Sequence, residues 1–262
     1  MAEYTKRYNP QRSADWNYGG SKWKLSRSKI DLFLECPRCF WVDNVQGIKR
    51  PSFPSFNLNL AVDELCKKEF DSYRHAGESH PLLEGAGIDA VPFAHPNLDT
   101  WRDPFVGIMH THAPTSLLVS GGVDDIWVTP QKTLIIADYK ATSKDGSITS
   151  LSDSPWEQQY ARQLSVYRWL LEQNGFTVEE TAYLVYANAD TSLDAFEDHL
   201  QFETTLIPVT TDCNWIEPTL HDIKVCLEQT TIPPAGTHCE YCAYREAVGK
   251  RLLTIHRQHT AT

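Results

Sequence analysis

Two aspartates and a lysine on neighbouring strand-like segments could do chemistry together. Asp124 lies in the run Gly-Gly-Val-Asp-Asp-Ile-Trp at 121–127, and Asp138 and Lys140 lie in Ile-Ile-Ala-Asp-Tyr-Lys at 135–140. Side chains alternate along a strand, so Asp138 and Lys140 share a face. Carboxylates hold hard divalent cations, and an ammonium group stabilises negative charge. This combination indicates metal-assisted hydrolysis of a phosphodiester.

The segment between these runs is typical of a hairpin turn. Residues 129–133 read Thr-Pro-Gln-Lys-Thr and separate two β-rich stretches. A register centred on Gln131 sets Asp124 opposite Asp138. We therefore expect both carboxylates on one face, while the opposite face enters the core with Val123, Ile135 and Ala137.

The donor atoms predict which ion this face would bind. Asp124 and Asp138 are the expected ligands, with the backbone carbonyl oxygen of Tyr139 as a further one, and oxygen donors favour Mg²⁺ or Mn²⁺ over zinc. Lys140 would orient the attacking water or stabilise charge on the phosphorus centre. The competing interpretation is a hairpin end with solvated charges, because Asp-x-Lys after an apolar strand is a pattern of low specificity.

Two Cys-x-x-Cys pairs form a second group of chemical interest. Cys36 and Cys39 lie near one end of the chain, and Cys239 and Cys242 lie near the other. Each pair can bind one metal centre from a single turn, and four thiolates complete a tetrahedral site. Such a centre would hold the two ends of the chain together and close a very large loop.

The overall composition favours one main globular domain in an intracellular setting. The 262 residues are 41% hydrophobic, which is enough for one substantial core. We expect a cytoplasmic protein without a membrane segment, since the longest apolar runs fall short of a span and the first residues lack the apolar centre of a signal peptide. Seven cysteines is an odd number, so a full disulfide framework is not expected.

Charge is distributed unevenly along the chain. The net charge of −10 argues against coating nucleic acid by bulk electrostatics. Residues 1–29, however, hold seven Lys or Arg against two acidic residues, and residues 243–262 hold four against one. The basic ends are compatible with a nucleic-acid contact and equally with simple solubilisation.

Hydrophobic periodicity and helix- or strand-breaking residues predict the secondary-structure elements around the acidic residues and the cysteines. The order of elements indicates an α/β fold with a mixed sheet flanked by helices. We expect helices from Ser26 or Ser28 to Cys36, over about 58–74, over 156–173 and from about 211 to 229. Strands are expected over 181–189 and 195–209 beside the hairpin. The stretch 76–114 is expected to be rich in loops, and 143–155 to form a lid or connector.

With the helix after the hairpin included, the pattern resembles a known family. It is similar to the RecB-like branch of the PD-(D/E)XK nuclease superfamily, which includes CRISPR-adaptation exonucleases and AddB-type repair nucleases. The resemblance is carried by Gly121-x-x-Asp124, Asp138-Tyr139-Lys140 and Gln163-x-x-x-Tyr167. It implies a restriction-endonuclease-like domain over residues 25–245, between a basic arm at 1–24 and a basic tail at 246–262. It also implies that Gln163 and Tyr167, four residues apart on one helical face, lie over the DNA and the edge of the active site.

The chain departs from the family pattern upstream of the hairpin. There the family usually supplies a His or Glu as a further metal ligand, whereas this chain has Asp63-Glu64. Asp63 offers the same oxygen chemistry and is carried over as a ligand on this resemblance. The alternative role of Asp63 is that of an exposed helix acid.

The cysteine pairs resemble the iron–sulfur staple of some RecB-like nucleases. In those proteins one early Cys in a Cys-Pro-Arg context joins a late cluster of three. Here Val248 occupies the region of the third late cysteine, and Cys39 offers a substitute. The resemblance implies a 4Fe–4S cluster, with structural Zn²⁺, His238 as a replacement ligand, or metal-free thiols as alternatives. Three other cysteines are expected to be ordinary buried thiols: Cys66, Cys213 and Cys226.

Two functions follow as hypotheses. The first is a Mg²⁺- or Mn²⁺-dependent deoxyribonuclease, an exonuclease on single-stranded DNA or DNA ends, in repair, recombination or CRISPR adaptation, with other proteins of those processes as candidate partners. The second is a catalytically silent nucleic-acid- or protein-binding scaffold of the same fold with a structural metal site. The acidic net charge and the absent upstream His favour the second.

Overall fold

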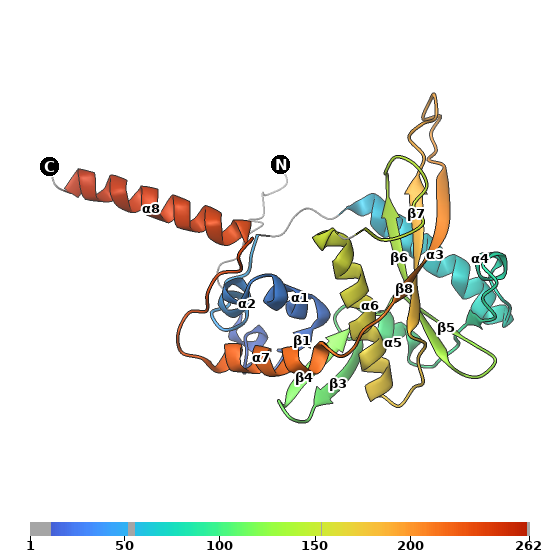
Figure 1. Cartoon of the computed structure of the whole chain (residues 1–262), viewed down its shortest axis with the longest axis horizontal. Coiled ribbons are helices and arrows are strands. Elements are labelled where there is room, and N and C mark those ends of the chain that lie inside the picture. Colours follow the sequence, from blue (N-terminus) through green and yellow to red (C-terminus); the bar gives the residue numbers. More distant parts are fainter. Residues whose placement is uncertain (1–11, 52–55, 153, 261–262) are drawn as a thin grey trace, which may run out of the picture. The chain divides into compact units, whose positions relative to one another are not determined.

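The computed structural model describes residues 12–51, 56–152 and 154–260 (Figure 1). The chain forms two compact units, one built from residues 1–53 and 218–262 and the other from residues 54–217. We call them the terminal unit and the central unit. Among the described residues, no helix is both long and apolar enough to cross a membrane.

The central unit contains most of the regular structure. Its elements are α3 (Asn57–Ala76), α4 (Pro81–Gly85), β2 (Val91–Pro92), α5 (Leu98–Arg102), β3 (Ile108–His112), β4 (Leu117–Gly121), β5 (Asp125–Val128), β6 (Leu134–Thr142), α6 (Pro155–Gln173), β7 (Thr181–Ala189) and β8 (Phe202–Thr210). The terminal unit contains η1 (Ala14–Trp16), β1 (Leu25–Ser26), α1 (Arg27–Glu35), α2 (Pro37–Asn44) and α8 (Glu240–Thr260), and α7 (Ile216–Glu228) leads into it from the central unit.

A five-stranded mixed sheet organises the central unit. The strand order is β2-β5-β6-β7-β8, in which β6 and β7 are parallel and the other neighbours are antiparallel. The connection from β6 to β7 runs through α6, as a parallel pair requires (Figure 1). β3 and β4 form an antiparallel hairpin of their own. The expected α/β class, a mixed sheet flanked by helices, is confirmed.

The hairpin register agrees with the one expected from the turn. β5 and β6 pair with Asp125 opposite Ala137 and Val128 opposite Leu134, so the same register places Asp124 opposite Asp138 just before β5 begins. The turn closes through a hydrogen bond from the Thr129 amide to the Thr133 carbonyl oxygen at 3.0 Å. The predicted core face is buried: Val123, Ile135 and Ala137.

An aromatic core supports the odd-numbered face of β6. Phe70 of α3 stacks on Trp127 of β5 with ring centroids 5.8 Å apart, and it contacts Tyr139 at 5.6 Å. All three side chains are at most 5% exposed. Burial of this area of aromatic surface fixes α3 against the hairpin. It thereby fixes the position of the polar residues that α3 carries one and two turns earlier.

Several element boundaries differ from the sequence-based expectations. The second long strand begins at Phe202, not at 195, because Glu197 and Asp198 adopt left-handed backbone conformations (φ 44° and 60°) that a strand does not accept. The last predicted helix begins at Ile216, not at 211. The loop-rich region 76–114 contains α4, β2, α5 and β3. These short elements lack the length over which periodicity becomes visible.

The position of Pro37 explains where α1 ends and where α2 begins. Ser26 precedes α1, and Cys36 ends it because the residue before proline is disfavoured in helical geometry. Pro37 then occupies the first turn of α2, where the absence of an amide hydrogen has no cost. The chain therefore turns sharply at Cys36, and this turn presents the first thiol of the Cys-x-x-Cys pair.

Candidate active site and cysteine centre

Asp138 and Lys140 lie together on β6, as the strand period requires. Asp138 is fully buried, and its Oδ2 atom forms an ion pair with Lys140 Nζ. The Lys140 ammonium also lies 4.9 Å from the ring centroid of Tyr160, on α6. The lysine is thus held in place from two directions, by a carboxylate and by an aromatic face.

Asp124 lies at the open side of the same site. Its Oδ2 atom accepts a hydrogen bond from the Tyr139 amide at 3.4 Å, and its Oδ1 atom lies 3.0 Å from Lys67 Nζ. The side chain is 23% exposed, whereas that of Asp138 is 0% exposed. Asp124 is therefore the carboxylate that faces the solvent, and Asp138 is the one enclosed by protein.

The two carboxylates differ in their pKa values as well as in their exposure. Burial first, and then the negative charge of Asp124, raise the pKa of Asp138 to about 7 against the opposing effect of Lys140. Burial also opposes ionisation of Asp124, but the positive charges of Lys67 and Lys140 outweigh it and lower the Asp124 pKa. A pair with diverging pKa values is typical of carboxylates that share one small space.

Gln163 and Tyr167 of α6 reach this site from the next helix. Gln163 Nε2 donates to Asp138 Oδ1 at 2.6 Å and to the Tyr167 hydroxyl at 2.9 Å. A Cβ on Gly121 would lie 2.9 Å from the Tyr167 ring, so glycine at this position permits the close approach of α6. The predicted Gly-x-x-Asp and Gln-x-x-x-Tyr patterns thus meet in space.

Asp63 is near the site but is separated from Asp124 by a cation. Its Oδ2 atom lies 2.8 Å from Lys67 Nζ, the same ammonium group that contacts Asp124. Burial and the negative charge of Asp124 raise the pKa of Asp63. Sequence reasoning did not identify Lys67, although its position four residues after an acid on a helix is a recognisable ion-pair spacing.

A buried ion-pair network on the opposite face of the hairpin was also missed. Asp125, 0% exposed, contacts Arg74 and accepts from Arg102 Nη2 at 3.1 Å and from the Tyr139 hydroxyl at 2.6 Å. Arg102 Nε additionally donates to the carbonyl oxygen of Asp124 at 2.9 Å. The network therefore fixes the backbone that carries Asp124. The Tyr139 side chain belongs to it, whereas metal binding by the Tyr139 carbonyl stays a prediction.

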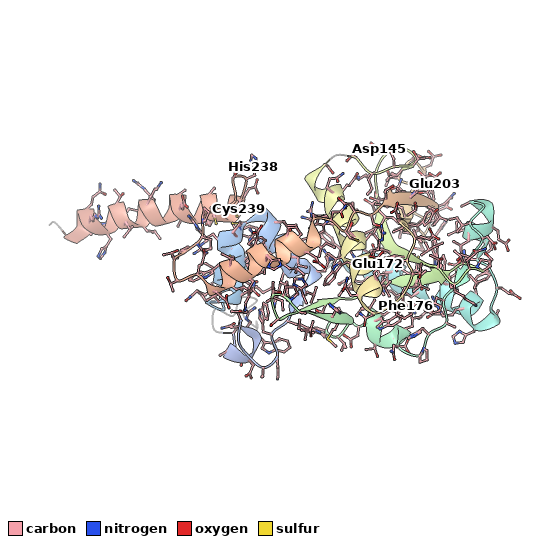
Figure 2. All side chains as sticks on the ribbon, turned by 60° about the horizontal axis from the view of Figure 1, so that its bottom comes forward. Asp145, Glu172, Phe176, Glu203, His238 and Cys239 are labelled. Carbon is pink, nitrogen blue, oxygen red and sulfur yellow. The ribbon has the colours of Figure 1, made fainter. Side chains whose placement is uncertain are left out.

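The lid or connector expected at 143–155 ends one residue earlier, because α6 begins at Pro155. The segment 143–154 is fastened to β7. The Asn188 side chain donates to the carbonyl oxygens of Lys144 and Gly146 at 2.9 and 3.0 Å. A hollow of about 700 Å³ lies beside it and is lined by residues that include Asp145 and Glu203. Both residues are labelled in Figure 2. The segment contains no helix or strand among its described residues.

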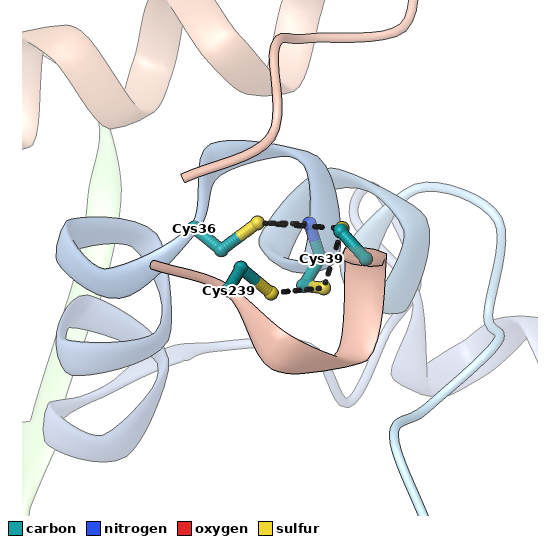
Figure 3. Close-up of side chains that lie close together, drawn as sticks. Cys36, Cys39 and Cys239 are labelled. Carbon is teal, nitrogen blue, oxygen red and sulfur yellow. Dashed lines mark hydrogen bonds between the residues drawn. The ribbon is translucent and has the colours of Figure 1, made fainter. Parts of the chain in front are cut away.

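The four paired cysteines converge in the terminal unit (Figure 3). Their sulfur atoms lie within 4.8 Å of one another, and the side chains are at most 4% exposed. Cys39 Sγ lies 3.5 Å from Cys242 Sγ and 3.6 Å from Cys239 Sγ, and Cys36 Sγ lies 3.7 Å from Cys242 Sγ. Within the described residues this is the sole group of three or more potential metal ligands gathered so closely.

Backbone amides and an arginine surround the sulfur atoms. The amides of Gly236 and Cys39 donate to Cys36 Sγ at 3.2 and 3.4 Å. Burial opposes a thiolate at Cys36, but these donors outweigh it and lower its pKa to about 7. Arg50 Nη2 donates to Cys239 Sγ at 3.1 Å. Donors of this kind stabilise sulfur that carries negative charge, as metal-bound thiolates do.

The other sulfur and nitrogen candidates lie outside this group. His238 is exposed and is not among the clustered ligands (Figure 2). Cys226 is buried, while Cys66 and Cys213 are partly buried. Burial raises the pKa of each of these three thiols to about 11, as expected for inert thiols in apolar surroundings.

Comparisons with known proteins add a family assignment. The sequence model described as "PD-(D/E)XK nuclease superfamily" matches residues 63–247, more than half of the chain. Among solved structures, the one titled "Crystal structure of SSO0001" is 15% identical, with 85% of this chain and 84% of that chain covered and a TM-score of 0.38. No curated protein matches the sequence.

Proposed function

The chain belongs to the PD-(D/E)XK nuclease superfamily, and from this premise we propose that it is a divalent-metal-dependent deoxyribonuclease that acts on single-stranded DNA or DNA ends. One observation carries the proposal: buried Asp138 is bound by Lys140 and Gln163 beside the more exposed Asp124. Two acids and an ammonium group from the β5–β6 hairpin thus meet the Gln163 amide from α6 at one place. The alternative of solvated charges at a hairpin end does not fit a carboxylate that is 0% exposed.

The donor set fits a hard divalent cation. Asp124 and Asp138 would hold Mg²⁺ or Mn²⁺ through carboxylate oxygens, with Asp63 and the Tyr139 carbonyl as further ligands. Such an ion, when bound, neutralises phosphate charge and lowers the pKa of a coordinated water. Gln163 fixes the orientation of the Asp138 carboxylate, and Asp124 faces the side from which the substrate arrives.

Lys140 is the residue to which we assign the electrostatic role. Its ammonium group is anchored by Asp138 and by the Tyr160 ring, so little reorganisation is needed to stabilise negative charge as the phosphodiester reacts. Tyr167, tied to Gln163, lies at the same edge.

We assign the chain to the RecB-like branch and propose exonuclease action in repair, recombination or CRISPR adaptation. The order of the motifs supports this, since Gly121-x-x-Asp124, Asp138-Tyr139-Lys140 and Gln163-x-x-x-Tyr167 follow one another as in that branch. The basic ends of the chain support a DNA partner.

For the cysteine centre we propose a 4Fe–4S cluster, with a structural Zn²⁺ ion as the alternative. Four buried thiols within 4.8 Å of one another support a shared metal centre of either kind. Zinc analysis and the absorption spectrum of anaerobically purified protein distinguish the two, because a cluster gives a brown protein that contains iron.

A Lys140→Ala variant tests the enzymatic proposal. We expect wild-type protein with Mn²⁺ to degrade linear single-stranded DNA and to spare a circular substrate, and Lys140→Ala to lose at least about 100-fold in rate. Lys132→Asn is the matched control, because Lys132 is exposed in the turn of the same hairpin and Asn tolerates its left-handed backbone (φ 67°). Circular dichroism establishes that both variants fold.

Other outcomes of this assay lead to different conclusions. Cleavage of the circular strand would replace exonuclease with endonuclease action, and preferential cleavage of RNA would change the substrate. Full activity in Lys140→Ala would reject the assigned role of the lysine. If wild-type protein cleaves nothing with any divalent ion but binds DNA or a protein, the scaffold hypothesis is correct.

A further inference from the structure

Lys67 lies between two of the carboxylates to which we assign metal binding. Its ammonium group is 2.8 Å from Asp63 Oδ2 and 3.0 Å from Asp124 Oδ1. These acids come from α3 and from the residue just before β5, so a single cation joins two separate segments. The Lys67 side chain is 23% exposed, and its two partners are 28% and 23% exposed. The contact is therefore partly sheltered and stronger than a surface ion pair.

The neighbouring lysine on the same helix provides a direct contrast. Lys68 pairs with Glu64 at 2.6 Å, with the same four-residue spacing as Lys67 and Asp63. Its side chain is 66% exposed, and that of Glu64 is 68% exposed. Helical ion-pair geometry alone thus explains Lys68. It does not explain the second contact of Lys67, 57 residues along the chain.

The charge of the site indicates what Lys67 does there. Asp63, Asp124 and Asp138 are balanced in part by Lys140, which contacts Asp138, and by Lys67, which contacts the other two acids. A divalent cation held by Asp124 would share this carboxylate with the Lys67 ammonium, which contacts its Oδ1 atom. Two cations on one carboxylate pair repel each other, so ammonium and metal compete.

We propose that the Lys67 ammonium group competes with divalent metal and thereby sets the metal affinity of the site. In the metal-free protein the same ammonium group holds Asp63 beside Asp124. The inference rests on the proposed metal site. Lys67 lowers metal affinity by opposing the ion electrostatically and by occupying its ligands. Its positive charge also offsets the repulsion between Asp63 and Asp124, which would otherwise push α3 away from β5.

Metal binding to three variants tests this role without a nuclease assay. Mn²⁺ dissociation constants are measured by isothermal titration calorimetry on wild type, Lys67→Met, Lys67→Arg and Lys68→Met. Methionine keeps the length of the side chain and removes its charge. We expect Lys67→Met to bind Mn²⁺ about tenfold more tightly, and Lys67→Arg and Lys68→Met to stay within about twofold of wild type.

Thermal unfolding gives a second, independent reading. Without metal, Lys67→Met is expected to melt below wild type, because Asp63 and Asp124 then repel each other without a counter-charge. Saturating Mn²⁺ should raise its melting temperature by more than that of wild type or Lys68→Met. If Lys67 merely packed against its neighbours, Mn²⁺ would raise the melting temperature of Lys67→Met no more than that of wild type.

Each outcome decides the proposal. Equal or weaker Mn²⁺ binding by Lys67→Met, when wild type binds and Asp124→Asn does not, overturns the role of Lys67 and leaves the metal site in place. If wild type binds no Mn²⁺, the proposed metal site and this inference fail together. Should Lys67→Met not fold, Lys67→Gln carries the same comparison.

Discussion

The two chemical centres of this chain are held together in opposite ways. In the central unit every charged group of the candidate active site has a partner supplied by the protein, such as Gln163 for Asp138 or Lys67 for Asp124. In the terminal unit the four buried thiols lie chiefly against one another. The groups of the first centre are held by other protein groups, whereas the second is a set of ligands gathered around one point.

The surroundings of the two centres strengthen this contrast. The active site stands on an aromatic core in which Phe70, Trp127 and Tyr139 are buried. The thiols themselves form a buried cluster of the terminal unit, against which the partly buried Leu32, Ala235 and Tyr241 pack. Apolar burial stabilises the central unit, and a bound metal would have to contribute much of the corresponding stability around the cysteines.

The largest expected effect is therefore loss of the cysteine centre. Cys39→Ser removes the thiol that contacts both Cys239 and Cys242. Structural metal sites contribute on the order of 10 kcal/mol of folding free energy, so we expect this variant to lose its metal and the order of the terminal unit. Hydrogen exchange should increase across α1, α2 and the segment 233–245 while β6 and β7 stay protected.

Cys66→Ser is the control for this experiment, because Cys66 lies on α3 outside the thiol group. It should keep both metal content and exchange pattern. Unchanged protection around Cys36 in the Cys39→Ser variant would show that apolar packing alone holds the centre, and the contrast between the two units would disappear.

The sequence predicted those features that depend on local period. Alternation along β6 placed Asp138 and Lys140 on one face, and the turn around Gln131 set the register that brings Asp124 opposite Asp138. The Cys-x-x-Cys spacing indicated one shared centre because a single turn can present two thiols. Each of these inferences uses neighbours within a few residues, for which backbone geometry is nearly fixed.

Features that join distant segments could not be predicted in the same way. Asp125 follows Asp124 directly, yet its partners Arg74 and Arg102 lie 51 and 23 residues away. Lys67 shows a local spacing only to Asp63, and its contact with Asp124 depends on how α3 packs on the sheet. Long-range ion pairs follow from tertiary packing, which periodicity does not encode.

The buried ion-pair network gives the second largest effect. Asp125→Ala leaves Arg74 and Arg102 without their fully buried partner, and removing one member of a buried pair costs about 3–5 kcal/mol. We expect the free energy of unfolding of the central unit to fall by that amount in denaturant titrations. The exposed Asp99→Ala should change it by less than about 0.5 kcal/mol. Equal effects of the two changes would show that the central site is not fastened by this network.

Gly121 provides a smaller and more local test of preorganisation. A methyl group on Gly121 would contact the Tyr167 ring at 2.9 Å and Leu170 at 3.1 Å, and overpacking of this kind costs about 1–3 kcal/mol. Tyr167 is hydrogen-bonded to Gln163, which in turn contacts Asp138. We therefore expect Gly121→Ala also to lower the cleavage rate. Gly85→Ala, where the methyl would meet open space, should affect neither quantity. A Gly121→Ala variant with wild-type stability would mean that α6 shifts freely.

The smallest effect concerns Glu157, which holds the start of α6 and the segment before it. Hydrogen bonds from Lys144 first, and then from Ser152, lower the pKa of Glu157 from 4.5 to about 2. A carboxyl group with a lowered folded-state pKa adds stability above its unfolded pKa and loses it as the pH falls. The stability difference between wild type and Glu157→Gln should therefore be constant above about pH 5.5 and shrink between pH 4.5 and 2.

The amplitude of this difference should stay below about 1 kcal/mol, because Lys144 is half exposed and solvent screens the pair. Urea titrations of both proteins at matched pH values measure it. A difference that persists at pH 2 would assign the contribution of Glu157 to packing rather than to its charge. In that case packing would hold the start of α6, as apolar packing would hold the thiol group if it kept its order without metal.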